Sequence, residues 1–187
     1  TVTYILPCAV GIASVEPTNL GDLGGDLIPL GIASIAAFLR EKGYGVGVLD
    51  SCALWLTDEK IIAILEEKKP RIIGLSSTTY ALPSTLELAK KIRNAFPDQL
   101  IVLGGSHANV AGRETIDEYS VFDLVAVGAD GEYTALEIVK AYAKYNYSRS
   151  EFLGDHELLS RIDGIFYEQG GVTVQNNPRA TTKNLDE

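Results

Sequence analysis

The sequence predicts an α/β fold in which a parallel sheet of five strands is covered by helices on both faces. Short apolar runs rich in Val, Ile and Leu alternate along the chain with segments of helical periodicity. This alternation is typical of parallel sheets that are buried between helices. Most of these runs also end in glycine or in small polar residues, as strands do where the carboxyl edge of a parallel sheet binds a ligand.

Five segments are expected to form the strands of this sheet, because each is short, apolar and bounded by glycine or polar residues. They are residues 2–6, 45–49, 71–75, 100–103 and 124–127. Right-handed crossovers between parallel strands favour the doubly wound order of flavodoxin-like, Rossmann-like domains. In that order the ligand lies at the carboxyl ends of the strands.

The segments between these strands predict helices. The first, over residues 29–42, begins with proline and ends before Gly43. The second, over residues 58–68, has Thr57 as its N-cap and cannot continue through Pro70. Further helices are expected over residues 83–96, in a shorter stretch after Gly112, and over residues 132–145.

The last part of the chain has a different pattern. Two short alternating segments, residues 164–168 and 172–175, are joined by a glycine-containing turn and predict a β-hairpin. We therefore expect three regions: an α/β domain over residues 1–147, an extension with the hairpin over residues 148–175, and a polar linker over residues 176–187.

The composition excludes several classes of protein. With 16 basic and 25 acidic residues the net charge is −9, which argues against nucleic acid as a partner. No apolar run reaches the roughly 18 residues that a membrane span needs, and the first residues lack the pattern of an export signal. Cys8 and Cys52 have neither metal-ligand spacing nor the number needed for a disulfide framework. We therefore expect a cytoplasmic protein.

A long loop is expected directly after the first strand, over residues 7–27. It carries several glycines and far exceeds the roughly two to six residues of an ordinary strand-to-helix connection. A loop of this length indicates either a binding loop or a disordered surface insertion.

Candidate binding residues follow the third, fourth and fifth expected strands. Hydroxyl side chains after the third strand can hydrogen-bond a polar ligand, although helix capping would account for one of them. Paired glycines after the fourth strand let a ligand approach the backbone where a Cβ would collide. The turn after the fifth strand suits either the same role or plain helix capping. The predicted cofactor-binding residues are Ser76, Ser77, Thr78, Thr79, Gly104, Gly105, Ser106, His107, Gly128, Gly131 and Glu132.

The two histidines do not predict a catalytic or metal site. His107 has the chemistry of a ligand or a general base, but no partner Cys, Asp or second His stands at ligand spacing. We therefore expect His107 to be a hydrogen-bonding loop residue and His156 to lie at the surface. Neither cysteine has an evident base, and no Gly-x-Ser-x-Gly elbow is present. Binding is favoured over catalysis.

An ordered series of short motifs runs through the chain, at residues 29–44, 48–50, 73–76, 102–108, 128–132, 163–167 and 184–187. In this order the motifs resemble the cobalamin-binding domain at the N-terminus of cobalamin-dependent radical SAM enzymes, and the resemblance covers residues 1–187. It implies that the corrin lies over the carboxyl edge of the sheet. The nucleotide tail would then descend near residues 76–79 and the Gly104-Gly105 turn.

Two departures from related domains bear on the cofactor. In the methionine synthase type, a histidine within an Asp-x-His-x-x-Gly motif after the first strand ligates cobalt, and this chain has no histidine there. The resemblance therefore implies cobalamin without a histidine ligand from that motif. The segment 128–132 also departs from the family's Gly-Glu-Gly-Glu pattern, which leaves the roles of Asp130 and Glu132 open.

The resemblance also carries expectations for a longer protein. The Cys-x-x-x-Cys-x-x-Cys motif of the radical SAM module does not occur here, so we interpret the chain as a cofactor-binding module joined to a C-terminal radical SAM domain. That domain would bind S-adenosylmethionine and a 4Fe-4S cluster, commonly for methyl transfer to a small molecule or peptide, without nucleic acid or membrane. Two alternatives stay open. One is a flavodoxin-like electron carrier that holds FMN, although this chain lacks the Ser/Thr-rich turn that flavodoxins usually have after the first strand. The other is a degenerate, cofactor-free domain of the same fold.

Overall fold

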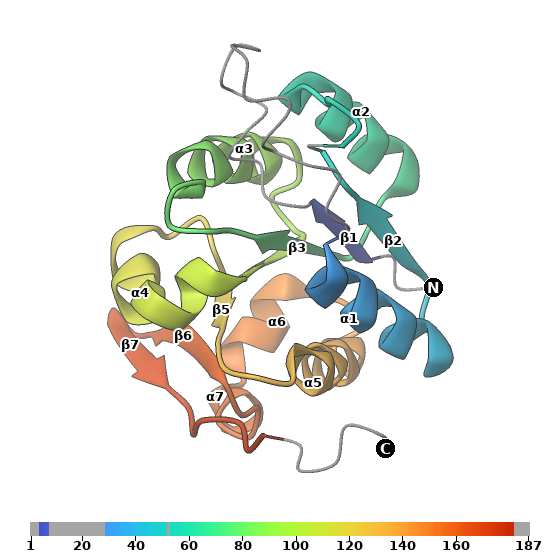
Figure 1. Cartoon of the computed structure of the whole chain (residues 1–187). Coiled ribbons are helices and arrows are strands. Elements are labelled where there is room, and N and C mark those ends of the chain that lie inside the picture. The colour runs from blue at the N-terminus through green and yellow to red at the C-terminus, as the bar shows by residue number, and fades with distance from the viewer. Residues whose placement is uncertain (1–3, 8–28, 52, 182–187) are drawn as a thin grey trace.

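The computed structural model describes residues 4–7, 29–51 and 53–181. Seven segments form strands: β1 (Tyr4–Pro7), β2 (Val46–Leu49), β3 (Ile72–Ser76), β4 (Leu100–Gly104), β5 (Leu124–Ala126), β6 (Ile165–Gln169) and β7 (Val172–Gln175). They make one sheet in the order β2-β1-β3-β4-β5-β6-β7 (Figure 1). Strands β1 to β5 pair in parallel, whereas β6 and β7 are antiparallel. The doubly wound order and the hairpin are both confirmed, and the hairpin extends the sheet.

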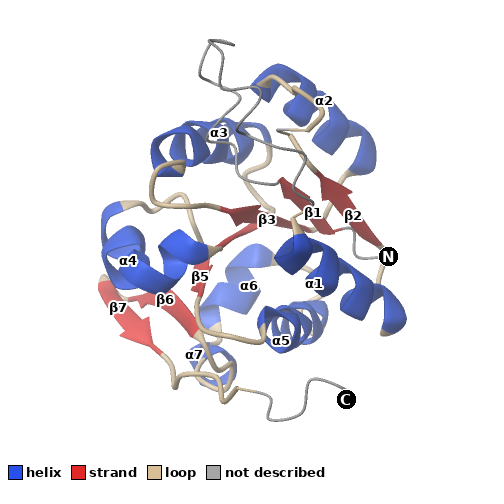
Figure 2. Cartoon of the chain, viewed as in Figure 1, coloured by secondary structure: helices blue, strands red, loops and turns tan. Residues whose placement is uncertain are grey.

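Helices cover both faces of this sheet (Figure 2). They are α1 (Leu30–Glu41), α2 (Asp58–Lys68), α3 (Leu82–Ala95), α4 (Ser106–Glu118), α5 (Gly131–Ala143), α6 (Arg149–Gly154) and α7 (His156–Leu159). Buried side chains of α1, α5, α6 and α7 form one core cluster, and those of α2, α3 and α4 form a second. Alternate residues of β3 and β4 enter the two clusters, which explains why these strands are apolar throughout.

Helix α4 begins earlier than the sequence predicts. The shorter helix expected after Gly112 starts at Ser106, and Ala111 interrupts it with non-helical angles of φ −136° and ψ 33°. Gly112 directly follows this kink, so the predicted shorter helix corresponds to the second part of α4. Gly112 also allows close packing, because an added Cβ would lie 2.9 Å from Cε2 of Phe166 in β6. As a result His107 lies in a helix, and the prediction that it lies in a loop is wrong.

Two short helices that the sequence does not predict, α6 and α7, lie between α5 and the hairpin. Neither offers a long periodic segment, since they span only 6 and 4 residues. Each contributes one large buried side chain to the first core cluster, Phe152 from α6 and Leu159 from α7. His156, at the start of α7, is half-buried, in contrast to the surface position expected for it.

The chain after β7 is anchored to the rest of the fold. The side-chain amide of Asn176 is buried and donates to the carbonyl oxygens of Leu159 and Ile162, at 2.6 and 2.7 Å. The backbone N–H of Gly164 donates to the carbonyl of Asn177 at 2.8 Å. The region boundaries at 147/148 and 175/176 stay predictions. Residues 8–27, both cysteines and residues 182–187 lie outside the described residues.

No helix in the described part of the chain combines the length and the apolar character that crossing a membrane requires. The cytoplasmic location stays a prediction.

Tyr142 gives the fold a testable pH dependence. This side chain of α5 is fully buried, and burial, aided by the negative charge of Asp123, raises the pKa of its phenol from 10.0 to about 12. Because the pKa is raised in the folded state, the contribution to stability is complete below about pH 10 and is lost as the pH rises towards about 12. We expect the free energy of unfolding to fall by about 2 kcal/mol more across this window than in Tyr142→Phe. Urea titrations from about pH 9 to 12 measure the difference, and parallel curves for the two proteins would contradict it.

Candidate functional site

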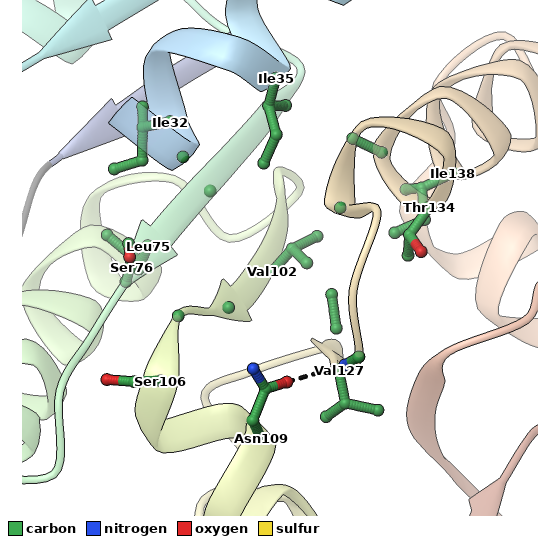
Figure 3. Close-up of a pocket in the computed structure, with 18 residues that line it drawn as sticks. Ile32, Ile35, Leu75, Ser76, Val102, Ser106, Asn109, Val127, Thr134 and Ile138 are labelled. Atoms are coloured by element: carbon green, nitrogen blue, oxygen red, sulfur yellow. Dashed lines mark hydrogen bonds between the residues drawn. The ribbon is translucent and has the colours of Figure 1, made fainter. Parts of the chain in front are cut away.

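A cavity of about 350 Å³ opens at the carboxyl edge of the sheet, between the strands and the first turns of α1 and α5 (Figure 3). Strands β3, β4 and β5 contribute its floor, and the start of α4 contributes its rim. The residues that line it are Gly31, Ile32, Ile35, Gly74, Leu75, Ser76, Val102, Gly104, Gly105, Ser106, Asn109, Ala126, Val127, Gly128, Gly131, Thr134, Ala135 and Ile138. The volume falls at the lower end of the range for small-molecule pockets, about 300 to 1,000 Å³.

The cavity has apolar walls and a few polar groups. Ile32 and Ile35 of α1 stand opposite Val102 of β4 and Ile138 of α5 (Figure 3). The lining side chains with hydrogen-bonding groups are Ser76, Ser106, Asn109 and Thr134. This combination suits a ligand with a flat apolar part and a polar part that stays near the opening.

Glycines keep the cavity open. An added Cβ on Gly31, Gly104 or Gly128 would meet no other described atom within 4 Å, although all three residues line the cavity. Larger side chains at these positions would therefore extend into the empty space. On the opposite side, a Cβ on Gly131 would come within 3.2 Å of Cδ1 of Ile35, so α1 and α5 approach each other closely beside the cavity.

Gly105 joins the ends of β3 and β4. It has a φ of +91°, and an added Cβ would lie 2.7 Å from both Ser76 Oγ and the carbonyl oxygen of Ser77. The backbone around it is hydrogen-bonded in both directions, from Ser77 N–H to the Gly104 carbonyl and from His107 N–H to the Ser77 carbonyl. The loops after β3 and β4, which the sequence predicts as ligand contacts, are thus hydrogen-bonded to each other.

His107 ties this arrangement to the body of α4. Its Nε2 lies 2.9 Å from Thr115 Oγ1, and the Thr115 hydroxyl itself donates to the carbonyl of Ala111. Nε2 must therefore donate to Thr115, and Nδ1 lies at hydrogen-bond distance from the Thr79 hydroxyl oxygen, 3.2 Å. The ring is buried and both nitrogens are occupied, so His107 fixes the loop after β3 and does not face the cavity.

The structure brings together part of the predicted site. Six predicted residues line the cavity: Ser76, Gly104, Gly105, Ser106, Gly128 and Gly131. Ser77, Thr78, Thr79, His107 and Glu132 are not among the lining residues. The Ser77 hydroxyl donates to the Thr78 carbonyl and accepts from Thr85, and the Thr78 hydroxyl accepts from Ala81 N–H within the turn before α3. The N-cap of α3, Ala81, makes no side-chain cap hydrogen bond, so helix capping does not account for these hydroxyls. Direct contact of these five with a ligand stays a prediction.

Sequence reasoning missed the helical walls. Helix α1 contributes Ile32 and Ile35, and α5 contributes Thr134 and Ile138, all at positions with the periodicity of ordinary core residues. The available signal was Gly31, because a glycine in the first turn of an otherwise strong helix calls for a reason.

Asn109 was also missed, because nothing in the sequence relates it to the turn after β5. Its side-chain oxygen accepts from Gly128 N–H at 2.7 Å. This contact joins the start of α4 to that turn and orients the amide at the cavity rim (Figure 3).

Among residues 4–7, 29–51 and 53–181, no three His, Cys, Asp or Glu side chains gather as ligands would. The lining of the cavity offers shape, apolar surface and hydrogen-bonding groups.

Comparisons with known proteins agree with a binding domain of this kind. The family model of the B12 binding domain matches residues 17–139. PH0819 of Pyrococcus horikoshii, named an uncharacterized methyltransferase, is 31% identical over 159 residues, which are 85% of this chain and 32% of that protein. The anaerobic magnesium-protoporphyrin IX monomethyl ester cyclase of Cereibacter sphaeroides is 25% identical over 166 residues, 88% of this chain and 26% of that protein.

A solved structure shares the fold. The cobalamin-dependent S-adenosylmethionine radical enzyme OxsB, with aqua-cobalamin and S-adenosylmethionine bound, matches with a TM-score of 0.70 at 19% identity, over 96% of this chain and 22% of that chain. The chain thus spans about a third or less of the length of these similar proteins. The family model covers β2 to β5, all of α1 and the part of α5 that lines the cavity, so the chain belongs to the family of B12-binding domains.

Proposed function

We propose that this chain binds cobalamin, with the nucleotide tail in the cavity between the sheet, α1 and α5 and with the corrin over the carboxyl edge. The observation that carries the proposal is a cavity walled by apolar side chains and kept open by glycines at the edge where such folds bind ligands. A volume of about 350 Å³ suits the tail and is too small for the corrin as well.

The chemistry of the lining fits the two parts of such a tail. A heteroaromatic base is flat and apolar, and Ile32, Val102 and Ile138 offer a matching surface. A sugar phosphate needs hydrogen-bond donors, and the hydroxyls of Ser76 and Ser106 with the amide of Asn109 stand at the polar end. When bound, cobalamin supplies a cobalt centre that can carry and transfer an alkyl group, while the protein contributes binding and orientation.

We further propose that cobalt is bound without a histidine from the motif after the first strand. The loop over residues 7–27 contains no histidine. His107 is an unsuitable substitute because both of its ring nitrogens are hydrogen-bonded to threonines.

For the whole protein we propose a radical SAM enzyme of the methyltransferase type. The names of the similar proteins support this, since one is a methyltransferase and another a cobalamin-dependent S-adenosylmethionine radical enzyme. The partner of this domain would be a C-terminal radical SAM domain that binds S-adenosylmethionine and a 4Fe-4S cluster and acts on a small molecule or peptide.

The proposal is tested by incubating the chain with hydroxocobalamin, desalting it, and recording the visible spectrum. We expect the parent to retain corrin bands and Gly104→Leu to lose them, because leucine would fill the cavity. Gly154→Leu is the matched control, since that glycine also has open space around it but lies outside the cavity. It should retain the bands as the parent does.

Other outcomes distinguish the alternatives. Retention of FMN and not of hydroxocobalamin in a parallel desalting experiment would favour the flavodoxin-like electron carrier. A chain that unfolds cooperatively but retains neither ligand would be a cofactor-free domain. Equal retention of corrin by the parent and Gly104→Leu would place the tail elsewhere.

A further inference from the structure

We propose that Arg179 is a positioning residue for the cavity: it holds Thr134 with the hydroxyl turned away from the ligand, so that the methyl group forms the wall. Thr134 lies at the end of the first turn of α5 and lines the cavity, whereas Arg179 lies in the segment after β7. The inference rests on the proposed binding of cobalamin and concerns the same cavity.

The Arg179 side chain is held by four hydrogen bonds. Its Nε donates to Thr134 Oγ1 at 2.6 Å, and its two terminal nitrogens donate to the two carboxylate oxygens of Glu137. One of these nitrogens also donates to the carbonyl of Asp163 at 3.1 Å. Only 10% of the side chain is exposed. The planar fork of arginine is needed here, because one ammonium group cannot reach Thr134 and both oxygens of Glu137 in this geometry.

The segment that carries Arg179 lies directly behind the cavity wall. Val127, which lines the cavity, donates its N–H to the Gly164 carbonyl at 2.8 Å, and Gly164 in turn donates to Asn177. An added Cβ on Gly164 would lie 3.4 Å from Arg179 Cβ and 3.5 Å from Thr134 Oγ1. The Thr134 hydroxyl is therefore enclosed between Arg179 and Gly164.

This contact determines which group Thr134 presents to the ligand. Figure 3 shows its oxygen on the side of the residue that faces away from Val102, which stands across the cavity. Threonine in a helix populates two χ1 rotamers, so the hydroxyl needs a partner to stay in one of them. Without the guanidinium, the Thr134 side chain can rotate about χ1 so that its hydroxyl points into the cavity, whose wall is otherwise apolar. A polar group placed there without a partner would weaken the binding of a flat apolar base.

The test compares Arg179→Gln, Thr134→Val and the double variant in the whole chain. Dissociation constants are measured by absorbance titration with hydroxocobalamin and with cobinamide, which lacks the nucleotide tail. We expect Arg179→Gln to raise the dissociation constant of hydroxocobalamin by about 3- to 10-fold and to leave that of cobinamide unchanged. Adding Thr134→Val should restore the affinity for hydroxocobalamin to within about twofold of the parent, because valine has no hydroxyl and presents a methyl group to the cavity in either rotamer.

Two further variants distinguish a specific effect on binding from a general loss of folding. Arg179→Lys retains the charge beside Glu137 but not the fork, and should weaken hydroxocobalamin as Arg179→Gln does. Arg161→Gln is the matched control, since Arg161 forms an exposed pair with Glu157 away from the cavity, and it should bind both ligands as the parent does.

The possible results separate this inference from the proposed function. Equal weakening of both ligands in Arg179→Gln, or no rescue by Thr134→Val, would show a merely structural role for Arg179 and overturn the inference. Unchanged binding in Arg179→Gln, with a parent that binds hydroxocobalamin tightly, would overturn the inference alone. A parent that does not bind hydroxocobalamin would overturn both.

Discussion

Asp123→Ala is expected to lower the free energy of unfolding by about 3 kcal/mol, one of the two largest effects on stability that we predict. The Asp123 carboxylate is 1% exposed and lies just before β5. One oxygen accepts from Arg93 and from the backbone N–H of Ile101, and the other accepts twice from Arg149. These contacts join α3, β4 and α6. Removal of the carboxylate would leave two partly buried guanidinium groups without their common counter-ion.

Urea unfolding measures this effect, and two further variants show its origin. Asp123→Asn keeps the shape and one acceptor but not the charge, so it should fall between the parent and Asp123→Ala. Glu157→Ala breaks an exposed arginine pair and should leave the unfolding midpoint unchanged. If Asp123→Ala unfolds at the same urea concentration as the parent, the carboxylate contributes no net stability and the buried pairs only offset their own desolvation.

The order of the sheet could be predicted from the sequence because local patterns and the topology rule agree. Strands such as Ile72–Ser76 and Leu100–Gly104 are buried on both faces and therefore read as continuous apolar runs. The helix over Asp58–Lys68 was predicted with its observed bounds, since a threonine cap and a following proline mark its two ends. Helices α6 and α7 were missed because their formation depends on docking Phe152 and Leu159 into the core.

The candidate site could be predicted only where it consists of backbone. Glycines that follow strands predict, from the sequence alone, that a ligand can approach the backbone closely, and Gly104, Gly105 and Gly128 do line the cavity. The walls were not predictable, because Ile35 and Ile138 have the spacing of core residues and differ from them only in facing an empty space. The contact between Arg179 and Thr134 joins residues 45 positions apart, and no local pattern relates them.

Gly105→Ala is the second substitution for which we expect a large effect, a loss of about 3 kcal/mol in the free energy of unfolding. Two physical terms contribute. A φ of +91° is costly for any residue with a Cβ, and that Cβ would lie 2.7 to 2.8 Å from the carbonyl oxygen and the nitrogen of Ser77. Because these are backbone atoms held by hydrogen bonds to Gly104 and His107, they cannot move aside without breaking the junction of β3 and β4.

Substitutions at two other glycines separate the cost of the positive φ from the cost of the steric contact. Gly43 has a φ of +87°, but an added Cβ there would meet no described atom within 4 Å, so Gly43→Ala should cost only the conformational term, about 1 kcal/mol. Gly104→Ala has neither a positive φ nor a close contact and should leave stability nearly unchanged. Thermal and urea unfolding of the three variants give the ranking. If Gly105→Ala destabilises the protein no more than Gly43→Ala does, the ends of β3 and β4 can separate at little cost, and the rim of the cavity is adaptable and not rigid.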